Sequence, residues 1–88
     1  MAKVKLNVEM RSGTGFGVWV TVDEKSFHFK ESDSKTINLE PNFYVATVGG
    51  FEPTTALVTI TFSQGDQVIA QEEYRDPTFF GFISFDVK

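Results

Sequence analysis

Apolar and polar residues alternate along most of the chain, which is typical of β-strands that bury one face. The first alternating segment covers residues 3–10, and the second starts at Phe16 and ends at Val22. A turn with two glycines lies between them at residues 11–15, so the two segments are predicted to pair as a hairpin. Further predicted strands cover residues 26–30, 37–39, 43–48, 56–62 and 78–87.

The segment 67–74 leaves two interpretations open. It follows residues 63–66, which have the composition of a hairpin turn, and this favours a strand. It also lacks glycine and proline and has no β-branched residue after Ile69, so one or two turns of helix are the alternative.

Seven to eight short strands with turn residues between them predict an antiparallel β-sandwich, immunoglobulin-like or transthyretin-like. A small OB-type barrel is the alternative fold. Residues 1–88 are predicted to form a single domain with one core, because so short a chain has room for only one.

The chain contains no cysteine, so packing must supply the stability. Ten phenylalanines, two tyrosines and one tryptophan provide large apolar side chains for this purpose. The alternation predicts a core of Val4, Leu6, Val8, Phe16, Val18, Val20, Phe27, Phe29, Val58, Ile60, Phe62, Ile83 and Phe85.

The formal net charge of −4 makes nucleic acid an unexpected partner and argues against binding to an anionic lipid surface. No apolar run predicts a membrane span, and no segment at the start of the sequence has the pattern of a secretory signal. The sequence as written therefore predicts a cytoplasmic protein. An extracellular location is the alternative if Met1 and Ala2 replace a removed leader.

Residues 35–48 resemble the middle of transthyretin-like and carboxypeptidase-regulatory-like sandwich domains. In those families a short strand ends in a Leu-x-Pro-Gly turn and the next strand opens with tyrosine. Here Leu39, Pro41 and Tyr44 match, while Asn42 stands in place of the glycine. The resemblance implies a seven-stranded sandwich that acts as a non-catalytic binding, spacer or assembly module.

Residues 13–29 resemble the two base-stacking motifs of cold-shock domains, which read approximately Lys-Gly-Phe-Gly-Phe and Phe-Val-His-Phe. Phe16 and His28 would remain on the stacking platform that the resemblance implies, but Thr14, Val18 and Ser26 replace the family's lysine and two of its aromatic residues. This resemblance implies binding of single-stranded nucleic acid through exposed aromatic rings.

No catalytic residue, metal site or cofactor is predicted. His28 is the only histidine, and it alternates with Phe27 and Phe29, so an ordinary exposed strand residue is expected instead of a catalytic base. The acidic residues near 31–33 and 72–76 lack the glycine-punctuated spacing of a calcium loop.

Aromatic residues occur on both faces of strands that are expected to bury only one. The candidate binding residues are Trp19, Tyr44, Phe80 and Phe82, which the alternation places opposite core positions. A β-bulge at Gly81 or a second covering layer would account for some of them, and an exposed binding patch is the alternative.

Three functions follow as hypotheses. The first is a non-catalytic module that recognises a glycan or a partner protein through the exposed aromatics. The second is a structural subunit that forms a homo-oligomer through its edge strands or through Phe80 and Phe82. The third is a cold-shock-like binder of single-stranded nucleic acid.

Overall fold

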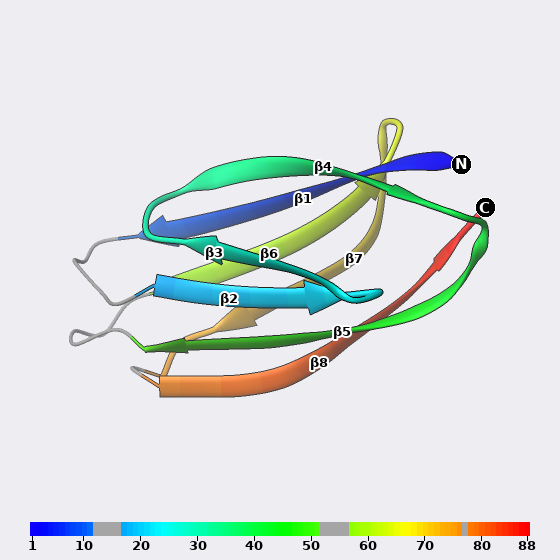
Figure 1. Cartoon of the computed structure of the whole chain (residues 1–88). Helices are drawn as coiled ribbons and strands as arrows, with labels where there is room; N and C mark the ends of the chain where they lie inside the picture. Colours follow the sequence, from blue (N-terminus) through cyan, green and yellow to red (C-terminus); the bar gives the residue numbers. More distant parts are fainter. Residues whose placement is uncertain (12–16, 52–56, 77) are drawn as a thin grey trace.

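The computed structural model describes residues 1–11, 17–51, 57–76 and 78–88, and only the backbone of Phe51. These residues form two four-stranded antiparallel sheets packed face to face (Figure 1). The first sheet has the order β4-β1-β6-β7 and the second has the order β3-β2-β5-β8. The strands are β1 (Ala2–Arg11), β2 (Gly17–Val22), β3 (Lys25–Phe29), β4 (Asp33–Leu39), β5 (Asn42–Phe51), β6 (Leu57–Gln64), β7 (Gln67–Tyr74) and β8 (Thr78–Val87).

The predicted all-β sandwich is confirmed, and the sheets are not closed into a barrel, which excludes the small OB-type alternative. The prediction that the first two strands pair as a hairpin is wrong. β1 pairs with β4 and β6, whereas β2 lies in the other sheet between β3 and β5. In immunoglobulin domains the first two strands are neighbours in one sheet, so the strand order here differs from that arrangement.

Two tight turns join neighbouring strands of the same sheet. Asp23 and Glu24 connect β2 to β3, and both have positive φ. A two-residue hairpin turn of this kind needs positive φ at both central residues to match the twist of the strands. Gly65 and Asp66 connect β6 to β7, so the predicted turn at residues 63–66 is confirmed. Residues 67–74 form a strand, and the helical alternative is excluded.

The core lies between the two sheets and consists of the residues that the alternation places inside. Nearly all predicted core residues are buried, and Phe27 is partly buried against the core. Phe16 lies outside the described residues. Phe62 of one sheet stacks on Phe85 of the other at a ring-centroid distance of 4.4 Å, which joins the two sheets directly.

β8 keeps an unbroken register with β5 from Thr78 to Val87, so the bulge considered at Gly81 does not occur. A β-carbon at Gly81 would approach the hydroxyl oxygen of Tyr74 to 2.9 Å. The glycine instead leaves room for Tyr74, which stacks on Phe79 at 4.4 Å and connects β7 to β8 across one side of the sandwich.

Burial raises the pKa of the Tyr74 hydroxyl, and the nearby Glu72 carboxylate raises it further. The pKa of Tyr74 is therefore higher in the folded state than in the unfolded state. The contribution of its neutral hydroxyl to stability is complete below the unfolded pKa and is lost as pH rises through the folded pKa. We expect the free energy of unfolding to decrease at alkaline pH less steeply in Tyr74→Phe than in the wild type. Urea titrations at a series of pH values from neutral to strongly alkaline measure the difference, and identical slopes would contradict the prediction.

Candidate functional site

The outer faces of the two sheets have opposite character. On the β4-β1-β6-β7 sheet, most outward residues of the central strands are polar and include Lys3, Lys5, Asn7, Thr59 and Thr61. The outer face of the β3-β2-β5-β8 sheet carries five of the seven large hydrophobic side chains that are exposed among the described residues. These five are Trp19, Phe43, Val45, Phe80 and Phe82. We call this surface the aromatic face.

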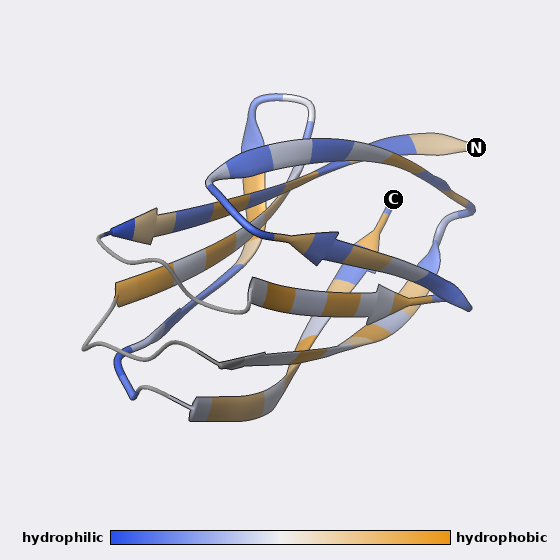
Figure 2. Ribbon diagram, turned by 60° about the vertical axis from the view of Figure 1, so that its left-hand side comes forward, coloured by the Kyte–Doolittle hydropathy of each residue, from blue (hydrophilic) through white to orange (hydrophobic). Residues whose placement is uncertain are grey.

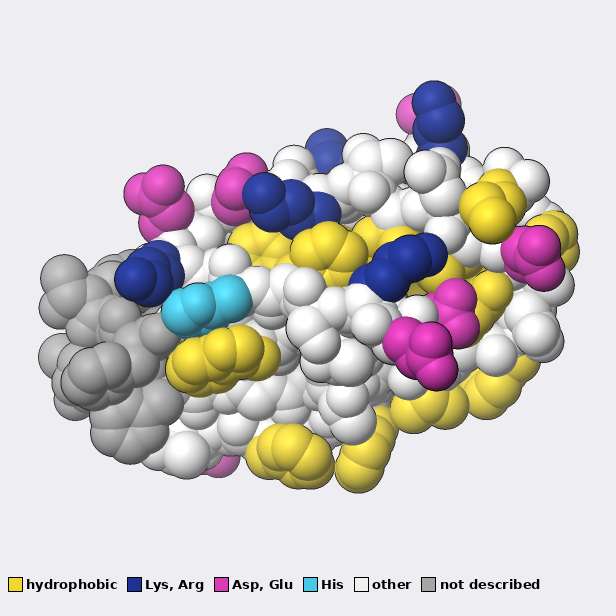
Figure 3. All heavy atoms as spheres, viewed as in Figure 1, with side chains coloured by type: hydrophobic (Ala, Val, Ile, Leu, Met, Phe, Trp, Pro, Cys, Tyr) yellow, Lys and Arg dark blue, Asp and Glu magenta, His cyan; other side chains and the backbone are white. Residues whose placement is uncertain are grey.

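One row of residues crosses the aromatic face from edge to edge. The register places His28 of β3 beside Trp19 of β2, then Gly49 of β5, and then Phe80 of β8. The Trp19 and His28 rings stack with centroids 4.5 Å apart and planes 3° apart. Trp19 is 45% exposed and Phe80 is 74% exposed. Yellow hydrophobic side chains on this side of the molecule lie beside the cyan histidine in Figure 3.

Gly49 leaves open space between the two aromatic side chains of this row. Among the described residues other than its chain neighbours, a β-carbon at Gly49 would have only Phe80 Cδ2 at 3.6 Å and the Phe79 carbonyl oxygen at 3.7 Å within 4 Å. The His28 ring covers one face of the Trp19 ring, and Gly49, which neighbours Trp19 on β5, has no side chain. In this row β5 therefore places no side chain beside Trp19.

A second row, next to the first, is rich in hydroxyl groups. Ser26, Thr21, Thr47 and Phe82 are successive neighbours across β3, β2, β5 and β8. The Thr21 and Ser26 hydroxyl oxygens are 3.0 Å apart, and the Thr47 hydroxyl donates to the Thr21 carbonyl oxygen at 3.4 Å. Aromatic rings and hydroxyl groups thus lie side by side on one open surface. The described residues enclose no pocket.

Trp19, Phe80 and Phe82 lie on the outer face as predicted, and no described element covers Phe80 or Phe82. The prediction that Tyr44 belongs to the uncovered set is wrong. Its ring packs against the core and against Phe85, and its hydroxyl donates to the Glu40 carbonyl oxygen at 2.7 Å. Phe43, one residue earlier, takes the outward position.

Two features of the site did not follow from the sequence prediction. His28 contributes a stacked ring, because β3 pairs with β2 in a register that places it opposite Trp19. Gly49 matters because the register places it between Trp19 and Phe80. The available sequence signal was the phase of β5, in which Thr47 and Gly49 alternate with the apolar Ala46 and Val48.

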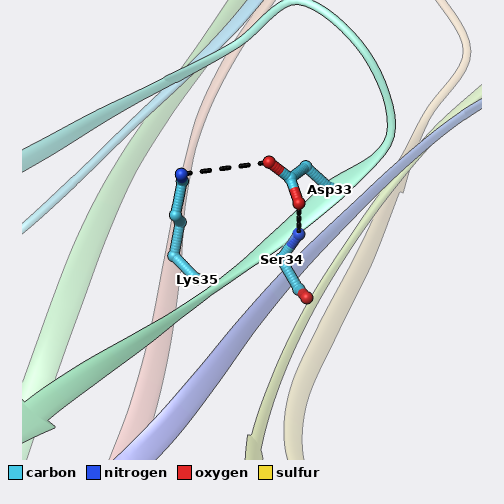
Figure 4. Close-up of polar contacts among 3 residues, drawn as sticks. All are labelled: Asp33, Ser34 and Lys35. Atoms are coloured by element: carbon cyan, nitrogen blue, oxygen red, sulfur yellow. Dashed lines mark hydrogen bonds and ion pairs between the residues drawn. The ribbon is translucent and has the colours of Figure 1, made fainter.

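Two of the acidic residues considered as calcium ligands, Asp33 and Glu73, have protein partners. The Asp33 carboxylate accepts a hydrogen bond from the Ser34 backbone N–H at 2.8 Å and lies 3.9 Å from the Lys35 ammonium (Figure 4). Glu73 lies 3.6 Å from the Arg75 guanidinium. Within the described part of the chain, no three acidic, histidine or cysteine residues are grouped in a way that could hold a metal ion.

The described chain contains no helix long and apolar enough to cross a membrane. No family model, curated protein or solved structure matches the chain. The resemblances of residues 35–48 and 13–29 therefore stay predictions.

Proposed function

We propose that the chain is a non-catalytic binding module that recognises a glycan on the aromatic face. The observation that carries the proposal is the row of His28, Trp19, Gly49 and Phe80 beside a row of hydroxyl side chains. The C–H face of a sugar ring is apolar and packs on an aromatic ring, while its hydroxyl groups exchange hydrogen bonds with serine and threonine.

The shape and charge of the surface support the same proposal. An open face without a pocket suits an extended chain of sugars lying across the strands better than a small molecule that needs to be enclosed. The protein has a net charge of −4, which does not favour a polyanionic ligand, whereas a neutral sugar is unaffected by it. Trp19 combines a large apolar ring with an indole N–H that can donate a hydrogen bond.

A partner protein is the second candidate. Phe43 and Val45 extend the aromatic face beyond the two rows, and both are more than half exposed. An apolar surface of this extent is also what a protein interface buries at its centre. The two candidates make different predictions for Phe43, because it lies away from the Trp19 row and next to Asp86 in the register.

We expect Trp19→Ala to weaken glycan binding at least about tenfold, since a stacked aromatic residue at the centre of a site contributes much of the binding energy. The same change removes a half-exposed side chain, so its cost in stability is expected to be about 1 kcal/mol or less. Calorimetric titration with soluble oligosaccharides of glucose, xylose and mannose measures the affinity of both proteins, because the variant lacks the only tryptophan. In the wild type, tryptophan fluorescence also reports binding. The free protein is expected to show red-shifted emission that a bound sugar shifts to the blue.

Two variants sharpen this test. Gly49→Val adds a side chain next to Trp19, and its β-carbon would be at ordinary contact distance from Phe80. It should abolish sugar binding and leave the melting temperature nearly unchanged. Phe43→Ala is the matched control and should bind sugar like the wild type. If the protein binds an oligothymidylate but none of the saccharides, and if this binding weakens steeply with salt, the nucleic-acid function is favoured instead.

A further inference from the structure

The four edge strands of the sandwich differ in how they are protected against pairing with another chain. An exposed edge presents unpaired N–H and C=O groups, and natural proteins guard it with short length, charged side chains, proline or bulges. β3 and β4 are edges on one side of the sandwich, and β7 and β8 are edges on the other.

Three of these edges carry such features. β3 has only five residues, and its Lys25 ammonium donates to the Asn38 carbonyl oxygen of β4 at 3.0 Å, which links the two edges on that side. β4 carries the charged residues Asp33 and Lys35, drawn in Figure 4. β7 contains an irregularity in its pairing, opposite Phe62 and Ser63, and two adjacent glutamates.

β8 carries almost none of these features. It is ten residues long, has no lysine, arginine or proline, and pairs with β5 without a register shift. Its single charged residue, Asp86, lies near one end. Figure 2 shows β8 with alternating orange and paler residues, in contrast to the blue segments of β4. Phe80 and Phe82 project from this edge strand and are 74% and 64% exposed.

We propose that β8 pairs antiparallel with β8 of a second copy of this chain, about a two-fold axis at Phe82. In this register Phe82 lies opposite Phe82 of the second copy, Phe80 lies opposite Ser84, and Thr78 lies opposite Asp86. The only charged side chain of the strand thereby meets a threonine and stays far from its counterpart, so the strand is self-complementary. The β3-β2-β5-β8 sheets of the two copies thereby join into one eight-stranded sheet.

The expected interface is small. Two phenylalanine rings of roughly 150–250 Å² each, about two-thirds exposed, bury roughly 200–300 Å² per copy, against about 800 Å² per partner in a standard interface. Backbone hydrogen bonds along the strand add to this contribution. We therefore expect a reversible dimer with a dissociation constant of about 10–100 μM, in the range of weak, transient associations.

The two-fold axis keeps both aromatic faces on the same side of the joined sheet. Each dimer then presents two Trp19 rows to one extended ligand, and a polymer that reaches both rows is held more tightly than by either alone. This consequence depends on the proposed glycan function, but the strand pairing itself does not.

Sedimentation velocity over a concentration series from micromolar to millimolar tests the pairing. Phe82→Lys places two like charges opposite each other and should raise the dissociation constant at least about tenfold. Ser84→Lys, on the same edge, should also weaken the dimer. Phe43→Lys is the matched control, because it adds the same charge to the same face on a central strand. It should dimerise like the wild type.

Each outcome supports or overturns the proposal. A wild-type protein that stays monomeric at millimolar concentration overturns it, as does a Phe82→Lys variant that dimerises normally. Equal loss of the dimer in Phe82→Lys and Phe43→Lys would assign the association to the aromatic face and overturn edge pairing. Trp19→Ala should keep the dimer, so loss of sugar binding with intact dimerisation separates the two proposals. Circular dichroism confirms that each variant is folded.

Discussion

Replacing Ile60 with alanine is expected to lower the free energy of unfolding by about 2–4 kcal/mol, a large fraction of the stability of a small domain. Ile60 is fully buried on β6, which has β1 on one side and β7 on the other. The truncation removes apolar contacts and leaves a cavity between two sheets whose strands cannot easily move together. Urea unfolding of the wild type and the variant measures the difference.

Thr59→Ala is the matched control, because Thr59 is the neighbouring residue on the same strand and points to the outer face. Its effect should stay below about 1 kcal/mol. Similar losses in both variants would show that the assignment of inner and outer positions on β6 is incorrect, and with it the packing between the sheets.

The alternation in the sequence predicts which residues face the core, because successive side chains of a strand point to opposite faces. It does not predict which strands are neighbours. Residues 3–10 and 17–22 alternate in the same way whether they form a hairpin or lie in different sheets. The pairing of β1 with β4 and β6 joins segments distant in the sequence, and no local pattern records it.

The candidate site was predictable to a similar extent. The phase of β2 places Trp19 outside, and the phase of β8 places Phe80 and Phe82 outside, as the structure has them. The error at Tyr44 arose because β5 has an aromatic residue in each phase near its start. Both phases are apolar there, and only Thr47 and Gly49, further along, mark the outer one.

The close partners within the site depend on register, which side-chain alternation leaves open. His28 and Trp19 become neighbours only because the turn at Asp23 and Glu24 fixes how β3 pairs with β2. The glycines of β5 illustrate the same limit. Gly49 borders the aromatic face, whereas Gly50 points inward, where a β-carbon would approach the Phe79 ring to 2.5 Å.

Gly17, the first residue of β2, makes room for the His28 ring. Gly17 lies two residues before Trp19, yet the space above it is occupied by the His28 ring. A β-carbon at Gly17 would approach His28 Nε2 to 2.5 Å and the Phe29 carbonyl oxygen to 2.6 Å. Its φ of +111° is also a conformation that residues with a β-carbon rarely adopt.

We therefore expect Gly17→Ala to destabilise the protein by about 2–5 kcal/mol, from backbone strain together with the conflict at Phe29. The variant should also displace His28 and so alter the emission of the tryptophan that stacks on it. Gly49→Ala is the control, because its β-carbon meets only ordinary contacts and should change stability by less than about 1 kcal/mol. Chemical unfolding and fluorescence spectra of both variants provide the comparison. A Gly17→Ala protein with wild-type stability and emission would show that His28 does not occupy the space above Gly17.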